Sequence, residues 1–117
     1  MTITRGSCHC GAVQFQADIA LDHLATCNCS MCGRTGAIMA FVPADKLERL
    51  GGEDKLTDYQ FGKKNIHHTF CSICGVRPYA MGTGPDGKPS AMINVRCLEG
   101  VDVHTLKIAH QYDGKSL

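Results

Sequence analysis

The amino-acid sequence predicts a mainly β fold of antiparallel sheets in which bound metal holds distant segments together. Several stretches alternate apolar and polar residues with a period of two, which is typical of half-buried strands. Helical periodicity is scarce, and 13 glycines among 117 residues fit many turns between short strands. Seven of the eight cysteines fall into three tight clusters, which indicates metal sites. We expect residues 1–117 to form a single domain.

Alternation predicts most of the strands. Residues 12–19 place their apolar side chains on one face of a strand: Val13, Phe15, Ala17 and Ile19. Residues 38–42 form a short apolar run, which predicts a buried strand. Residues 56–61 and 66–70 predict a hairpin around the turn residues between them. Residues 91–98 alternate again and predict a further strand.

Glycine and proline indicate the connections. Residues 81–90 (MGTGPDGKPS) predict a loop, because Gly and Pro fit turns and interrupt strand pairing. Residues 30–35 can form one helical turn that ends at Gly36. Residues 43–50 can form another short turn. The sequence therefore predicts only one or two short helical turns.

Charge and hydropathy exclude several classes of protein. The net charge is +1, and the largest basic cluster, near Lys63 and Lys64, is too small for a nucleic-acid footprint. No run approaches the roughly 20 apolar residues of a membrane span. Residues 1–11 lack the apolar stretch of a signal peptide. We therefore expect a cytoplasmic protein with no nucleic-acid or membrane partner, whose clustered cysteines are metal ligands or catalysts rather than disulfides.

The Cys-x-x-Cys pair at Cys71 and Cys74 is typical of a metal-binding knuckle and needs two more ligands. Cys8 and Cys10 are the natural donors, because residues two apart in an extended chain share a face. Such a site would join segments more than 60 residues apart where a disulfide would be reduced. The alternatives are free or catalytic thiols, or a redox pair, for which the usual βαβ context is missing.

The middle cluster, Cys27, Cys29 and Cys32, places three thiolates within six residues. Three thiolates on Zn²⁺ leave one position for water, a substrate or an incoming thiol, which zinc would ionise. The alternative is a second structural site completed by Cys97 or by a histidine. Cys97 itself lies on the apolar phase of a predicted strand, so we expect a buried, inert thiol.

Other polar residues give weaker indications. Ser30 and Arg34 lie close to the middle cluster in sequence and can support its ligands. Arg34, Arg77 and Arg96 can each pair with a carboxylate, but nothing in the sequence ranks them, so we expect solvated or structural roles. Of the adjacent His67 and His68, one should face inward from a strand, and no histidine is placed to act as a general base.

Taken together with their flanks, the clusters resemble the glutathione-dependent formaldehyde-activating enzyme family, a domain also found in centromere protein V. The matching segments are GSCHCGAVQF at residues 6–15, CNCSMC at 27–32 and FCSICG at 70–75. The segment INVRCLEGVD at residues 93–102 also resembles a family segment. The resemblance covers nearly the whole chain.

The resemblance implies a β-tent zinc-binding fold of stacked antiparallel sheets and two zinc ions per chain. We expect the second site to be only partly occupied, because three thiolates lose metal to competing thiols more readily than four. It implies a structural zinc on Cys8, Cys10, Cys71 and Cys74. It also implies a catalytic zinc on Cys27, Cys29 and Cys32. In the founding activity, glutathione and formaldehyde combine to S-hydroxymethylglutathione, which is formally a carbon–sulfur lyase reaction in the synthetic direction.

We therefore expect a cytoplasmic zinc-dependent enzyme of the carbon–sulfur lyase type that acts on a thiol adduct, with glutathione as the small-molecule partner. The alternative is a non-catalytic zinc-binding module of the same fold that binds a protein partner. A zinc-ribbon nucleic-acid binder is disfavoured because the chain lacks a basic patch. The physiological substrate and the oligomeric state are not fixed by the sequence.

Overall fold

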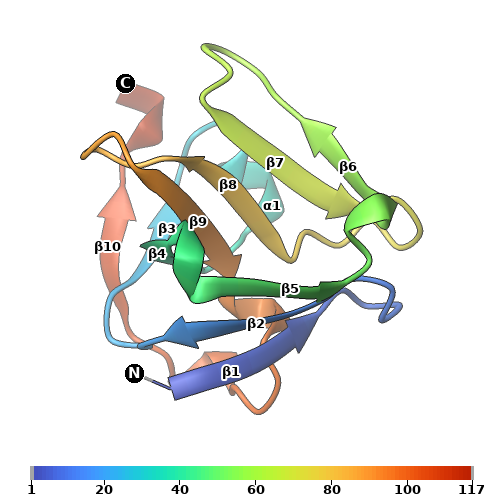
Figure 1. The fold of residues 1–117 in the computed structure, drawn as a ribbon. Coiled ribbons are helices and arrows are strands. Elements are labelled where there is room, and N and C mark those ends of the chain that lie inside the picture. The colour runs from blue at the N-terminus through green and yellow to red at the C-terminus, as the bar shows by residue number, and fades with distance from the viewer. Residues whose placement is uncertain (1, 117) are drawn as a thin grey trace.

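The computed structural model describes residues 2–116, within which ten strands form two sheets (Figure 1). The small sheet has the order β1-β2-β5 and is antiparallel: β1 (Thr2–Ser7), β2 (Gln14–Ile19) and β5 (Leu47–Gly51). The large sheet has the order β10-β3-β4-β9-β8-β7-β6. Its strands are β3 (Leu24–Cys27), β4 (Met39–Pro43), β6 (Leu56–Tyr59), β7 (Ile66–Cys71), β8 (Tyr79–Thr83), β9 (Pro89–Asn94) and β10 (Ile108–Tyr112). The predicted mainly β class is confirmed.

Helical segments are short, as predicted. The α-helix is a single turn, α1 (Cys32–Thr35), which ends at Gly36 with φ 67° and a backbone N–H donated to Cys32. The remaining helical segments in the described residues are 3₁₀ turns: η1 (Ala44–Lys46), η2 (Glu53–Lys55), η3 (Val95–Cys97), η4 (Val103–Thr105) and η5 (Gly114–Ser116). The turn expected within residues 43–50 is only η1, because β5 takes up the rest. No helix among the described residues is long and apolar enough to cross a membrane.

The hydrophobic core lies between the two sheets. Phe15 of β2 is fully buried and meets Tyr79 of β8 edge to face, with ring centroids 5.5 Å apart. The alternation predicted for residues 12–19 is confirmed, since Phe15, Ala17 and Ile19 all face this core. Full burial of one large apolar side chain stabilises the fold by about 1.5–3 kcal/mol. The small sheet therefore covers one face of the large sheet.

The opposite face of the large sheet is also apolar. In β4, Ala40 and Val42 are buried against the core, whereas Met39 and Phe41 point to the other side, and Phe41 is 47% exposed. The prediction of a buried strand at residues 38–42 is wrong for this outer face. A strand between a core and an open cleft is apolar on both faces, so its sequence resembles that of a fully buried strand.

The loop predicted for residues 81–90 is confirmed for residues 84–88 and is wrong at both ends. β8 and β9 pair up to Thr83 and Pro89, so the connection is a short turn in which the Gly84 N–H donates to the Lys88 carbonyl. Pro89 is the first residue of β9, a position where proline is tolerated in a sheet. The strand predicted for residues 91–98 is too long, because β9 ends at Asn94 and Cys97 lies in η3.

The hairpin predicted at residues 56–61 and 66–70 is confirmed as β6 and β7, which pair Tyr59 with His68. The pairing of β10 with β3 is parallel and has no counterpart in the predictions. It places the chain after β10 beside Cys27, where the Asn28 N–H donates to the Tyr112 carbonyl. The strands β1, β3, β5, β8 and β10 were not expected from alternation.

Candidate metal sites and the adjoining cleft

Two similar turns present the four cysteines Cys8, Cys10, Cys71 and Cys74. In the connection from β1 to β2, the Cys8 N–H donates to the Val13 carbonyl at 3.1 Å. At the end of β7, the Cys71 N–H donates to the Val76 carbonyl at 2.9 Å. Each turn thus closes on the residue five positions ahead of its first cysteine. This repeated geometry directs both cysteines of each turn toward the same point.

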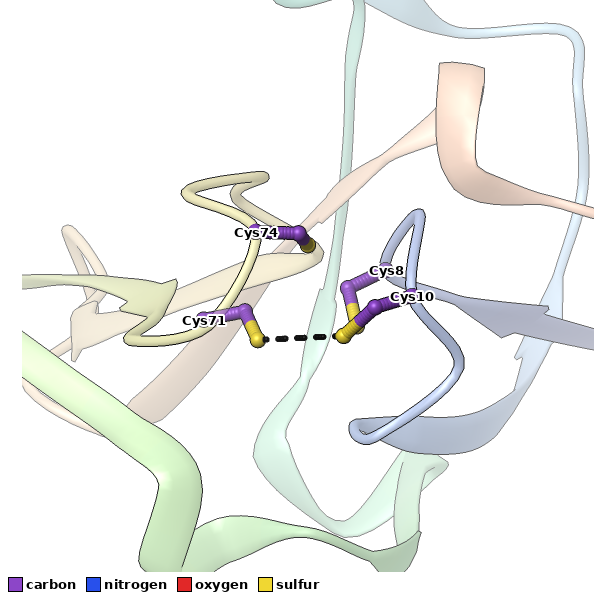
Figure 2. A group of neighbouring side chains, drawn as sticks. All are labelled: Cys8, Cys10, Cys71 and Cys74. Carbon is purple, nitrogen blue, oxygen red and sulfur yellow. Dashed lines mark hydrogen bonds between the residues drawn. The ribbon is translucent and has the colours of Figure 1, made fainter.

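The sulfur positions fit a tetrahedral metal ion. The Cys10 Sγ lies 3.6 Å from the Cys8 Sγ and 3.7 Å from the Cys71 Sγ, the pair joined by the dashed line in Figure 2. All four Sγ atoms lie within 4.8 Å of one another. Tetrahedral zinc with bonds of about 2.3 Å separates its sulfur ligands by about 3.8 Å. The four residues can therefore hold a metal ion with little movement.

Backbone N–H groups favour thiolates at this site. Val13 donates to the Cys8 Sγ at 3.3 Å, and Ile73 donates to the Cys71 Sγ at 3.4 Å. Backbone hydrogen bonds, first that of Val76, lower the pKa of Cys74 to about 6. At Cys10 the Ala12 N–H also lowers the pKa, but desolvation and the neighbouring thiols together raise it to about 11. A divalent ion would supply the positive charge that favours the thiolate form of Cys10.

The second group joins the end of β3 to the start of α1. The Cys29 N–H donates to the Cys27 Sγ at 3.4 Å, and the Cys32 N–H donates to the Cys29 Sγ at 3.3 Å. The three Sγ atoms lie within 4.8 Å of one another, and no further Cys, His, Asp or Glu of residues 2–116 belongs to the group. Cys97 lies elsewhere, with its Sγ 3.8 Å from the Arg77 carbonyl, and it is half-buried rather than buried as predicted, because it lies in η3 and not in a strand.

Burial opposes the ionisation of one thiol of this second group. Desolvation, followed by the neighbouring Cys29, raises the pKa of Cys32 to about 12. At Cys29 desolvation also raises the pKa, but hydrogen bonds from the backbone and from Cys32 outweigh it, so the pKa is lowered overall. Three closely spaced sulfur donors fit a divalent ion, whose positive charge favours the thiolate form of Cys32.

A cleft of about 610 Å³ opens beside Cys27, Cys29 and Cys32. Its floor is the outer face of the large sheet: Met92 of β9 lines it, while the flanking Ala91 and Ile93 face the core. This volume lies within the usual range for small-molecule sites. The three sulfurs therefore stand at the edge of a space in which a small molecule fits.

Aromatic rings form two walls of the cleft. On the side of β6 and β7, Phe61 stacks on His68 with centroids 5.2 Å apart. On the side of β4 and β10, Phe41 meets Tyr112 edge to face at 6.3 Å. The two walls face a space whose other lining is largely aliphatic.

Arg77 is the functional candidate that the sequence did not rank. It lies between β7 and β8 and lines the cleft, where its Nη2 donates to the His68 Nδ1 at 2.8 Å. Arg34 instead donates to the backbone carbonyl of the exposed Ser30, and Arg96 is exposed in η3. None of these three residues lines the cleft. No local pattern distinguishes the three arginines, because only the fold brings Arg77 to the cysteines.

His68 is the inward-facing member of the histidine pair, as expected. It is 7% exposed, and desolvation, followed by the charge of Arg77, lowers its pKa. Because arginine can only donate, the His68 Nδ1 accepts, and the proton of this neutral ring lies on Nε2. His67 faces outward and pairs with Asp58, its Nδ1 2.6 Å from the carboxylate.

The segment after β10 covers the other side of the second group. Asn28 holds this segment: its Nδ2 donates to the Asp113 carboxylate at 2.9 Å, and its Oδ1 accepts from the Lys115 N–H at 3.1 Å. At Gly114 the backbone approaches so closely that an added Cβ would lie 2.6 Å from the Cys27 Sγ. Only glycine fits at this position without displacing the cysteines.

Comparison with known proteins agrees with this architecture. The family model described as "Glutathione-dependent formaldehyde-activating enzyme" matches residues 3–112. A crystal structure of a Rhodobacter sphaeroides protein, solved as a structural-genomics target, superposes with a TM-score of 0.82 at 33% identity. The alignment covers 92% of this chain and 98% of that one. The resemblance noted in the sequence is confirmed, and the chain belongs to the glutathione-dependent formaldehyde-activating enzyme family.

Proposed function

We propose that the protein is a zinc-dependent enzyme of the carbon–sulfur lyase type that acts on a thiol adduct, as S-(hydroxymethyl)glutathione synthase does. The observation that carries this proposal is the three-cysteine group at the edge of a cleft, with no fourth protein ligand among residues 2–116. A group of three leaves one coordination position for a small molecule. A low-molecular-weight thiol is the proposed substrate, and glutathione, the thiol named in the family description, is the reference compound.

The two cysteine groups have different proposed roles. Cys8, Cys10, Cys71 and Cys74 hold a structural ion that joins the β1–β2 connection to the end of β7. Cys27, Cys29 and Cys32 hold the second ion. A zinc ion bound there would favour the thiolate form of a substrate thiol and would act as a Lewis acid.

The chain's own contribution is orientation and charge. The floor and aromatic walls would confine the two reactants beside the cysteines. This confinement would lower the entropy cost of bringing the thiol sulfur and the carbonyl carbon of formaldehyde together. The positive charge of Arg77 favours negative charge on Cys32 and Cys29 and on a thiolate beside them. His68 is neutral and therefore adds no positive charge of its own at this wall.

The test is zinc per chain before and after dialysis against millimolar glutathione, together with the rate of adduct formation from formaldehyde and small thiols. We expect about two zinc ions per chain to fall to about one, because three thiolates retain metal less well than four. We also expect the adduct to form faster than without protein. Two zinc ions that stay in place, with no acceleration for any thiol tested, would contradict the proposal and favour a closed structural site.

Replacing Gly114 with Ala should weaken metal binding at the second group while leaving the fold intact. The new Cβ would lie 2.6 Å from both the Cys27 Sγ and the Cys29 Cβ, so these atoms must move apart. We expect zinc per chain to drop toward about one at equal thermal stability. Gly51→Ala is the matched control, because no atom lies within 4 Å of its added Cβ. Equal zinc content in both variants would show that this close approach is unimportant.

A further inference from the structure

Arg77 is a half-buried cation without a carboxylate partner. Its hydrogen-bond partner among the described side chains is the neutral His68, and none of the ion pairs among residues 2–116 includes it. Burying a charge is costly unless it is paired. A guanidinium that has only one of its donors engaged, and that lines an open cleft, is arranged to receive an anion from outside.

The rest of the cleft offers little to other polar groups. Its lining contains no Asp, Glu or Lys, and its walls are the aromatic rings of Phe61, Phe41 and Tyr112. Met39 and Met92 fill the floor between these walls, and Ala80 and Gly82 leave room above the sheet. Such a surface favours a flat apolar body, with specificity supplied by the few polar groups at its edge.

We propose that the cleft binds a thiol or thiol adduct with a flat apolar body and a single carboxylate, and that this carboxylate pairs with Arg77. The placement of the ligand's sulfur beside Cys27, Cys29 and Cys32 rests on the proposed function. The placement of the ligand's carboxylate at Arg77 is independent of the proposed function and follows from the arginine and the cleft lining alone. The preferred ligand is thus an aromatic carboxylic acid that carries sulfur.

Glutathione fits this cleft less well than such a ligand. It carries two carboxylates and an ammonium group, and its two peptide units need hydrogen-bond partners when they leave water. Arg77 can take one carboxylate, but no acidic residue lines the cleft to receive the ammonium group. An apolar body instead buries its surface against rings that are already in place.

A rival role for Arg77 is to balance the charge of the three thiolates. The arginine is close enough for the charges of Cys32 and Cys29 to act on it. In that case its loss would lower metal retention without changing the choice of ligand. The two roles therefore differ in a measurable way.

The test compares ligands of matched shape with and without the carboxylate charge, by titration calorimetry on the zinc-loaded protein. The first pair is mercaptobenzoate and mercaptobenzamide, each as the meta and para isomer. The second pair lacks sulfur and consists of toluate, the anion of a ring-methylated benzoic acid, and the corresponding toluamide. We expect the carboxylate of each pair to bind roughly tenfold or more tightly than its amide, since a charge-assisted pair with Arg is lost in the amide. We also expect mercaptobenzoate to bind more tightly than glutathione.

Substitutions of arginine then test whether the preference for the carboxylate comes from Arg77. In Arg77→Gln the preference for carboxylate over amide should vanish, and in Arg77→Lys part of it should remain. Arg96→Gln is the matched control, because this exposed arginine lies outside the cleft and should keep the full preference. The comparison of carboxylate with amide is made on the wild-type protein. It therefore tests the carboxylate preference even if a variant fails to fold.

The outcomes separate this inference from the proposed function. A carboxylate preference in the sulfur-free pair upholds the Arg77 site even if no thiol chemistry is found. Thiol chemistry without any carboxylate preference overturns the inference and leaves the proposed function standing. Tighter binding of glutathione than of mercaptobenzoate overturns the inference as well. Loss of zinc from Arg77→Gln with an unchanged ligand preference would show the charge-balancing role instead.

Discussion

Replacing Cys71 with Ala is expected to unfold the protein. Cys71 is fully buried at the end of β7, where its sulfur meets that of Cys10 from the β1–β2 connection. Its loss would remove one of four ligands and release the contact between two segments 61 residues apart. The metal site is the proposed link between these segments, and we expect its loss to loosen the three-stranded sheet from the core.

The expected size of this effect follows from comparing two free energies. Structural zinc binding contributes about 10–16 kcal/mol in small zinc domains, whereas a typical domain is stable by only about 5–15 kcal/mol. We therefore expect Cys71→Ala to lose the cooperative thermal transition seen by circular dichroism, and a strong chelator to have the same effect on the wild type.

The matched control for Cys71 is Cys97→Ala. Cys97 is a half-buried thiol near the same cluster, but it is not one of the four grouped cysteines. We expect it to lower the free energy of unfolding by no more than about 1–2 kcal/mol, the cost of removing one partly buried group. A Cys71→Ala protein that melts at the temperature of the wild type would disprove a structural role for this metal site.

Replacing Cys29 with Ala is expected to abolish thiol-adduct chemistry without unfolding the protein. Cys29 is the central member of the second group, and its Sγ accepts the Cys32 N–H at the start of α1. Two remaining thiolates would not retain zinc against competing thiols. We expect about one zinc ion per chain, a melting temperature close to that of the wild type, and a rate reduced at least about 100-fold.

Ser30→Ala is the matched control for Cys29. Ser30 is the exposed neighbour of Cys29, and only its backbone carbonyl is engaged, by Arg34. We expect this variant to keep both the zinc content and the rate. Equal rates in wild type and Cys29→Ala would remove the second group from the proposed chemistry and favour a binding module instead.

The cysteine groups and the alternating strands could be predicted from the sequence because both signals are local. The spacing between Cys71 and Cys74 indicates a knuckle by itself, and the period of two at Phe15 and Ala17 indicates a buried face. The spacing of Cys8 and Cys10 indicated the two further ligands of that site, and the resemblance to the family implied the same grouping. Each of these inferences needs only a short stretch of chain.

The remaining features depend on contacts between distant segments. The parallel pairing of β10 with β3 joins residues more than 80 positions apart, and no local pattern indicates it. The β8–β9 hairpin was missed because Gly82, Gly84 and Pro89 favour a loop when read alone. Arg77 could not be distinguished from Arg34 and Arg96, because its importance comes from the walls that other strands place around it.

The alternation along β4 has a consequence for how ligand preference can diverge. Ala40 and Val42 belong to the core, whereas Met39 and Phe41 line the cleft, so neighbouring residues on one strand serve stability and recognition separately. A substitution at 39 or 41 can reshape the cleft without opening a cavity in the core. Evolution, or an engineer, can therefore change what the protein accepts at every second position of this strand while its fold stays the same.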